Sequence, residues 1–238
     1  MAGHAFPLDR SVYQMNEAAR LLGLPDKTLR RWIDGDRRFD RTIEPLIRPE
    51  HTGDANVTWG EFVEAGLLAE YRVRRLPMEK LRPLIADLRE QMGTPYPLAL
   101  ARPLYSDGRN LLWRLQEKSG IDEELFLVVN DRTENGYQLL LSEVTKQFAS
   151  RVEFEPPETG IVIKWFPWRS KRRRIVIDPR VAFALPTISG VRTEVIAEFA
   201  AAGEPIPAIQ GFYADYGLSE SDIGEAIRFE QSLYRTAA

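Results

Sequence analysis

A glycine between two short amphipathic segments constrains the fold of this chain more than any other feature. The apolar residues of the first segment fall on one face of a helix: Ala18, Ala19, Leu21 and Leu22. Gly23 follows at the position where a helix end favours a positive φ. After Pro25 a second segment places apolar residues at i, i+3 and i+4 spacing: Leu29, Trp32 and Ile33. The sequence therefore predicts two short helices that cross at a tight turn.

The second predicted helix carries polar and basic side chains on the faces turned away from its apolar stripe: Lys27, Thr28, Arg30 and Arg31. Two short helices, a glycine turn and a basic second helix match the helix-turn-helix arrangement, whose second helix enters the major groove of DNA. Side chains of these types reach phosphates and base edges there. The alternative is a pair of adjacent bundle helices whose basic face is merely solvated.

A basic loop follows the helix pair and is broken by Pro45 and Pro49; its arginines are Arg37, Arg38, Arg41 and Arg48. A wing strand is expected in this place. We predict Arg37, Arg38 and Arg41 as further DNA-contacting residues. Residues 61–71 then have the apolar spacing of a helix.

Residues 13–25 (YQMNEAARLLGLP) and 28–32 (TLRRW), together with 57–72, resemble the winged-helix head of the MerR family of transcription regulators. The resemblance covers about a quarter of the chain. It implies a winged-helix DNA-binding domain, which we assign to residues 1–76. The long antiparallel dimerisation helix that usually follows in that family is missing. We still expect a homodimer on double-stranded promoter DNA, because helix-turn-helix proteins usually read two half-sites.

Residues 77–178 predict a central α+β module that dimerises the protein or links its two ends. Apolar residues in phase predict a helix over 77–92. Asp107-Gly108 lies between apolar runs and is a strong β-hairpin signal. Strands are expected at 126–129, 137–141, 152–154, 161–166 and 174–177.

The most basic stretch of the central module is residues 164–174, where aromatic and cationic side chains alternate and no acidic residue occurs. Such a pattern suits nucleic-acid backbones and bases. We predict an accessory DNA contact through Lys171, Arg172, Arg173 and Arg174. In the alternative interpretation the segment is an exposed basic turn, and Trp165, Phe166 and Trp168 fill the core.

The charge changes sign in the tail, residues 179–238. Its basic residues are Arg180, Arg192, Arg228 and Arg235. Its acidic residues are Glu194, Glu198, Glu204, Asp215, Glu220, Asp222, Glu225 and Glu230. Glycines at 203 and 217 separate three predicted helices, and Ser219 with Asp222 forms a capping box before the third. Contact with protein is more expected here than contact with DNA, because like charges repel.

The tail resembles, over about its last fifty-five residues, the trihelical domain found in antitoxins that are paired with PIN-domain toxins. The resemblance lies in Asp178-Pro179, residues 186–192 (PTISGVR), 195–197, 202–204 and 216–219. With a MerR-like head, the architecture is similar to a VapB-type antitoxin of a bacterial type II toxin–antitoxin (VapBC) pair. That family implies repression of its own operon and neutralisation of a PIN-domain ribonuclease by direct binding. Arg228 and Arg235 are the candidates to face the carboxylates of the nuclease site.

The composition excludes several classes of chemistry. The chain has no cysteine, so it has no disulfide, zinc–thiolate or iron–sulfur site and no cysteine nucleophile. His4 and His51 lack the spacing of metal ligands. No catalytic set can be assembled, so we expect no enzyme and no cofactor. Without an export signal or an apolar run near 18 residues we expect a cytoplasmic protein with no membrane partner. The alternative function is a stand-alone MerR-like regulator whose middle domain senses a small molecule or a protein.

Overall fold

The computed structural model describes residues 7–37, 42–73, 78–101, 106–133, 136–156, 160–167, 170 and 172–237. It is a mixed α+β structure of small helical and sheet units, as the sequence predicted. No helix in these ranges is long and apolar enough to cross a membrane. Arg38, Arg41, Lys171 and the side chain of Arg235 lie outside the described part of the chain.

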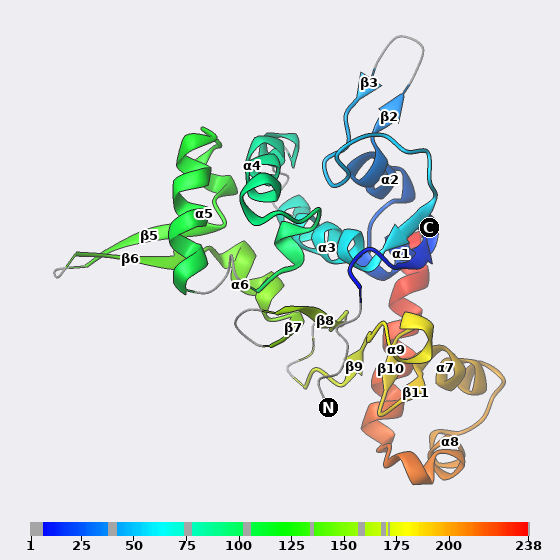
Figure 1. The fold of residues 1–238 in the computed structure, drawn as a ribbon. Coiled ribbons are helices and arrows are strands. Elements are labelled where there is room, and N and C mark those ends of the chain that lie inside the picture. The colour runs from blue at the N-terminus through cyan, green and yellow to red at the C-terminus, as the bar shows by residue number, and fades with distance from the viewer. Residues whose placement is uncertain are drawn as a thin grey trace.

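The head is a winged helix-turn-helix (Figure 1). Strand β1 (Ser11–Gln14) pairs antiparallel with β4 (Asn56–Thr58). Between them come α1 (Met15–Leu22), α2 (Asp26–Asp34) and a small wing of β2 (Asp36–Arg37) and β3 (Thr42–Ile43). Gly23 ends α1 at φ 67°, the left-handed conformation that the sequence predicted for the turn. Helix α3 (Trp59–Val73) follows β4 and is buried along most of its length.

The middle of the chain consists of short helices and two β-hairpins. The helices are η1 (Met78–Leu81), α4 (Arg82–Met92), η2 (Pro97–Ala99), α5 (Ser106–Lys118), η4 (Glu123–Leu125) and α6 (Glu143–Ala149). Strands β5 (Val128–Thr133) and β6 (Gly136–Leu141) form the first hairpin. Strands β7 (Val152–Glu155) and β8 (Ile161–Trp165) form the second.

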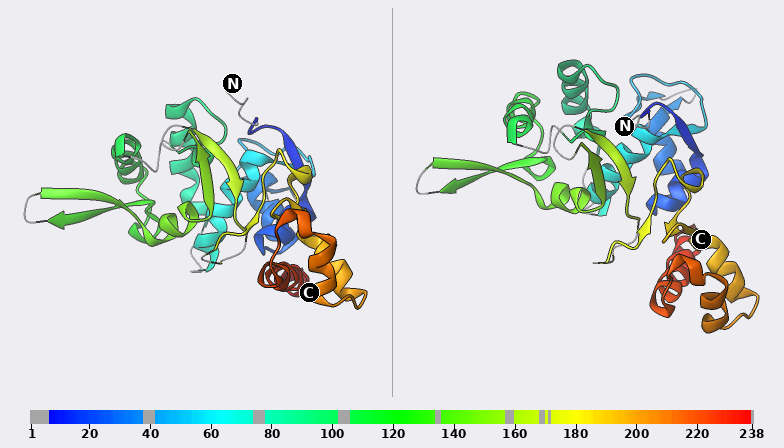
Figure 2. Two further views of the ribbon diagram at one scale, coloured as in Figure 1. Left: turned by 90° about the horizontal axis from the view of Figure 1, so that it is seen from below. Right: turned by 60° about the horizontal axis from the view of Figure 1, so that its bottom comes forward.

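The hairpin predicted around Asp107-Gly108 is wrong, because this dipeptide falls in the first turn of α5. Leu112 and Leu115, three residues apart, are both buried, so helical periodicity outweighs the local turn preference. Buried Gln116 of α5 accepts a hydrogen bond from the backbone N–H of Leu127 at 3.1 Å, next to β5. The β5–β6 hairpin instead projects from this side of the molecule, opposite the tail in every view (Figures 1 and 2).

The tail begins with a three-stranded sheet in the order β11-β10-β9. Its strands are β9 (Ile175–Val176), β10 (Thr187–Ile188) and β11 (Val191–Arg192), with η5 (Ala182–Ala184) between the first two. Three helical segments follow: α7 (Thr193–Ala201), α8 (Ile206–Phe212) continued by η6 (Ala214–Tyr216), and α9 (Glu220–Ala237). The capping box is present, because Ser219 Oγ accepts from Asp222 N at 3.2 Å and Ser219 N donates to Asp222 at 3.0 Å.

One cluster of buried apolar residues runs from the head through the middle into the tail. Helix α3 lies at its centre: Trp59 Nε1 donates to the carbonyl of Val162 in β8 at 2.7 Å. Gly66 of α3 allows the ring of Trp165 to approach so closely that a Cβ would lie 2.2 Å from it. The head and the middle therefore share a core, and the domain boundaries after residues 76 and 178 stay a prediction.

Candidate nucleic-acid interface

Helix α2 divides its side chains as the sequence predicted. Leu29, Trp32 and Ile33 are buried against the head, whereas Lys27, Arg30 and Arg31 are exposed and Thr28 is half-buried. The apolar stripe fixes the rotation of the helix about its axis, so the cationic face points away from the core. The bundle alternative loses its main support here, because no element covers that face in the described part of the chain.

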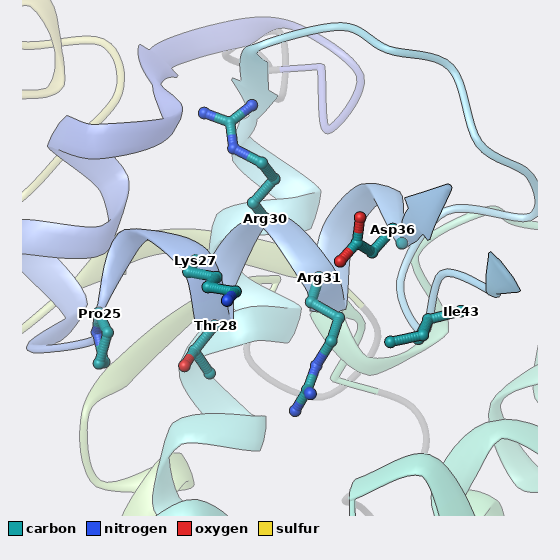
Figure 3. A pocket seen from close by; sticks show the side chains of 8 residues that line it. Pro25, Lys27, Thr28, Arg30, Arg31, Asp36 and Ile43 are labelled. Atoms are coloured by element: carbon teal, nitrogen blue, oxygen red, sulfur yellow. The ribbon is translucent and has the colours of Figure 1, made fainter. Parts of the chain in front are cut away.

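A concavity of about 530 Å³ lies between α2 and the wing. It is lined by Pro25, Lys27, Thr28, Arg30, Arg31, Gly35, Asp36 and Ile43. In Figure 3, Arg30 leaves the helix on one side and Arg31 and Thr28 leave it on the other. The two arginines therefore flank the exposed ridge of α2, and Arg37 is exposed on the neighbouring wing strand.

Within the described part of the chain, the two arginines take part only in weak surface ion pairs. Arg30 lies 3.7 Å from Asp26 one turn earlier, and Arg31 lies 3.8 Å from Glu79. All four side chains are about half exposed, and pairs of this kind contribute about 0–1 kcal/mol each. A phosphate group can therefore replace either carboxylate at little cost.

Gly35 sets the position of the wing. Its φ is 74°, and a Cβ at this residue would lie 2.3 Å from the carbonyl oxygen of Ile43 in β3. Only glycine allows the chain to leave α2 and pass so close to the second wing strand. The small size and backbone freedom of Gly35 thus shape one wall of the concavity.

Arg48, one of the four arginines of the predicted basic loop, does not face solvent. It is buried and donates from Nε to Glu61 at 2.6 Å and from Nη1 to Asp34 at 2.9 Å. Burial alone would raise the pKa of Asp34, but hydrogen bonds from Thr52, Arg48 and Gly53 lower it to about 2. Arg48 therefore ties the base of the wing to the end of α2 and the start of α3 and is shielded from DNA.

One signal for the structure of the head was present in the sequence and was missed. Thr58 and Glu61 form a capping box at the start of α3, since Thr58 N donates to Glu61 at 2.8 Å and Glu61 N to Thr58 at 3.2 Å. The Thr-x-x-Glu pattern marks this helix start. Asp36 and Ile43 also line the concavity, and no local pattern predicts their place because the fold of the wing brings them there.

The basic segment of the middle module makes protein contacts. Arg172 Nη1 donates to Ser221 at 3.0 Å, and the guanidinium of Arg173 lies 3.8 Å from the ring centroid of Phe166. Arg174 donates to both carboxylate oxygens of Asp222 at 2.9 Å each. Trp165 and Phe166 are buried, as the core interpretation expected, and Trp168 lies outside the described residues. The accessory DNA contact stays a prediction.

The two candidate partner-facing arginines lie on α9. Arg228 is exposed, and its guanidinium lies along its own helix close to Gly224. Arg235 belongs to the last turns of the same helix. Within the described residues no group of His, Asp or Glu side chains has the arrangement of a metal site.

Comparison with known proteins agrees with this geometry. Residues 11–85 match a family model described as "Putative DNA-binding HTH domain". The head therefore is a helix-turn-helix DNA-binding domain, and the match ends within α4.

Two proteins of Mycobacterium tuberculosis match almost the whole chain. One, named "Uncharacterized protein Rv2308", is 35% identical over 237 residues, which is 97% of this chain and 94% of that protein. The other, named "Putative antitoxin VapB45", is 28% identical over 230 residues, 92% of this chain and 93% of that protein. A crystal structure of Rv2018 from the same organism aligns with a TM-score of 0.71 and 26% identity, covering 93% of this chain and all of that one.

Proposed function

We propose a function for this chain from the premise that it belongs to the family of the mycobacterial protein Rv2308. The function is that of a DNA-binding antitoxin, which represses its own operon and neutralises a PIN-domain ribonuclease toxin by direct binding. The helix-turn-helix head supports the first activity. A full-length relative with an antitoxin's name supports the second. Neither activity needs a catalytic group on this chain.

The observation that carries the DNA-binding half is the spread of Arg30 and Arg31 to opposite sides of α2. A helix in the major groove faces base edges at its ridge and has a phosphate backbone on either side. In this pose Arg30 and Arg31 reach the two backbones, Thr28 lies on the side of Arg31, and Lys27 faces the bases. Arg37 on the wing, with the neighbouring Arg38 and Arg41, reaches phosphates next to the groove.

The test is a titration of the full-length protein into a labelled duplex from its own promoter at several salt concentrations. Arg30→Ala with Arg31→Ala should weaken binding, and each lost phosphate contact should lower the slope of log affinity against log salt by about one. The matched control is Arg114→Ala with Lys118→Ala, which removes the same charge from exposed positions on α5. Equal affinity of wild type and the α2 variant at every salt concentration would show that α2 does not read DNA.

We infer a homodimer, because one head covers only one half-site. Sedimentation of the protein with and without the promoter duplex measures this directly. A monomeric mass in both samples would contradict it, whereas a dimer would predict two half-sites about one helical turn apart.

The antitoxin half is tested by affinity capture of the tagged full-length protein from its native host, followed by mass spectrometry. We expect a small ribonuclease in near-equal amount, encoded next to this chain. Its nuclease activity should fall when this protein is added. In this pair we assign Arg228 and Arg235 to the carboxylate-lined nuclease site, so Arg228→Ala should weaken the inhibition. Recovery of this protein alone would instead favour a stand-alone regulator.

A further inference from the structure

The stretch from Thr193 to Ile227, which includes α7, α8 and η6, contains no lysine, arginine or histidine. Its acidic residues are Glu194, Glu198, Glu204, Asp215, Glu220, Asp222 and Glu225. Asp222 is neutralised by Arg174, which reaches it from outside the stretch. The remaining surface is therefore strongly anionic, in a chain whose overall charge is only −3.

Four aromatic rings lie together on this anionic surface. The ring of Phe199 in α7 lies 5.4 Å from Phe212 and 6.3 Å from Tyr213, and Tyr213 lies 6.0 Å from Tyr216. Phe212 and Tyr216 are 59% and 54% exposed, which is unusual for large apolar side chains gathered in one place. These four rings form the aromatic patch of the tail.

Two exposed carboxylates lie next to the aromatic patch. The backbone N–H of Glu204 donates to the carbonyl of Phe199 at 3.1 Å, and Asp215 lies between Tyr213 and Tyr216 in the sequence. Among the residues that the structure describes, neither carboxylate has an ion-pair partner. Aromatic rings and unpaired negative charges are therefore neighbours in this part of the tail, and α7 and α8 lie far from α2 (Figure 1).

The charge and the exposed rings of this surface limit the kind of partner that can bind it. A second copy of the same surface is excluded as the occupant, because like charges would be placed opposite each other. Nucleic acid is repelled for the same reason. A cationic protein surface with apolar pockets between its charges is complementary, and a groove that binds single-stranded RNA has this composition.

We propose that the aromatic patch and its carboxylates dock into the RNA-binding groove of the partner ribonuclease, the rings in the place of bases and the carboxylates in the place of phosphates. The inference rests on the proposed function for the identity of the partner. It adds which surface of this chain binds and which surface of the nuclease is covered. Exposed aromatic anchors commonly carry most of the affinity of an interface, and complementary charges raise the association rate.

The test uses the ribonuclease captured by the wild-type protein, which is then purified and titrated with full-length variants. Phe212→Ala with Tyr216→Ala removes the exposed rings and should weaken binding at least about tenfold. Glu204→Lys with Asp215→Lys leaves the rings in place and should slow association at low salt. The matched controls are Phe183→Ala, a 92% exposed ring elsewhere, and Glu123→Lys with Glu124→Lys on η4. Thermal melting shows that each variant is folded.

A single-stranded RNA oligonucleotide provides a second readout. It should compete with wild-type protein for the ribonuclease, since both occupy one groove. The inference is overturned if the ribonuclease binds both tail variants like wild type. It is also overturned if the ribonuclease binds RNA and this protein at the same time. In either case the proposed function still stands. If a cationic protein without nuclease activity is captured by wild type and by neither tail variant, the docking surface is supported. The ribonuclease is then overturned as the partner. Capture of no cationic protein overturns both.

Discussion

Arg174 and Asp222 form a two-point ion pair in which Nε and Nη2 of the arginine each donate to one carboxylate oxygen at 2.9 Å. The same carboxylate caps α9 through Ser219. Burial alone would raise the pKa of Asp222, but the bonds from Arg174 and Ser219 lower it to about 2. One arginine of the basic segment thereby fixes the direction in which the last helix of the tail begins.

Replacing this arginine tests whether the pair stabilises the fold. Arg174→Ala should lower the free energy of unfolding by about 1–2 kcal/mol, because a charged hydrogen-bonded pair is lost at a partly exposed site. Because the pKa of Asp222 is lowered, the stabilisation is present above its ordinary pKa of 3.8 and disappears as the pH falls toward 2. Urea unfolding at pH 7 and near pH 2 should show a gap between variant and wild type at the first pH only. A shallower salt dependence of DNA binding in this variant would instead identify Arg174 as a DNA contact.

Glu64 of α3 is a buried carboxyl group with an incomplete set of partners. One oxygen accepts from Leu98 N at 3.0 Å, and the other has no hydrogen bond within the described structure and lies 3.9 Å from Arg89. Burial raises the pKa of Glu64 to about 8, although Arg89 and the Leu98 N–H oppose the shift. The group is therefore protonated at neutral pH.

We expect the protein to lose stability between pH 4.5 and about 8, where the unfolded chain releases the proton of Glu64 and the folded chain retains it. One pKa unit corresponds to about 1.4 kcal/mol, so the loss across this window is about 5 kcal/mol. Glu64→Gln should flatten the pH profile and be more stable than wild type at pH 8. The control is Glu70→Gln on the same helix, which should destabilise because Glu70 pairs with Arg151 at 2.8 Å. Parallel profiles for wild type and Glu64→Gln would contradict the assignment.

A comparison of alanine variants at two glycines with similar φ distinguishes the effect of backbone strain from the effect of a displaced wing. Gly35 and Gly53 have φ of 74° and 75°, but only at Gly35 would a Cβ meet another atom, the carbonyl oxygen of Ile43. Gly53→Ala should cost about 1 kcal/mol of stability from its positive φ, and Gly35→Ala about 1–3 kcal/mol, because its ψ of −163° lies in a region that only glycine occupies readily. Only Gly35→Ala should also displace the wing. We expect its promoter affinity to fall about tenfold, because the displaced strand loses a phosphate contact. Equal DNA affinity of the two variants would show that the wing does not contribute.

Local patterns were sufficient for the head and for the helices of the tail. Gly23 and Gly217 end their helices in the left-handed conformation, and the Ser219–Asp222 cap forms as its spacing predicts. They succeed because a cap or a turn depends on residues within one helical turn. The Asp107-Gly108 hairpin failed because Leu112 and Leu115 are both buried, and their helical spacing outweighs the turn preference of the dipeptide.

The candidate site, too, was predictable where it depends on local spacing and unpredictable where it depends on distant partners. Exposed Lys27, Arg30 and Arg31 follow from the apolar stripe of α2, since the spacing fixes the opposite face. The burial of Arg48 could not be predicted, because its carboxylate partners are 13 and 14 residues away in the chain. The charge of a loop residue says nothing about burial when its partners come from two other elements.

Tyr13 connects the first strand of the head to the start of the tail, and this contact gives the last prediction. Its buried hydroxyl donates to the carbonyl of Ala184 in η5, where three consecutive non-glycine residues, Ala182 to Ala184, have φ between 49° and 62°. A left-handed conformation costs about 1–2 kcal/mol per residue, so the turn depends on contacts that hold it. Tyr13→Phe should lower the free energy of unfolding by about 1–2 kcal/mol, because a buried carbonyl loses its donor.

The local effect of Tyr13→Phe distinguishes a bond that holds this turn from a bond that only adds to global stability. Amide hydrogen exchange at Ala184 and Leu185, whose N–H groups donate within the turn, should speed up more than exchange in α3, which measures global unfolding. The control Tyr96→Phe removes a half-buried hydroxyl that accepts a hydrogen bond from Thr58 of the head at 3.2 Å. It should leave exchange at Ala184 and Leu185 unchanged. Exchange that rises equally throughout the chain in the Tyr13 variant would show that the turn is held by its packing rather than by the head.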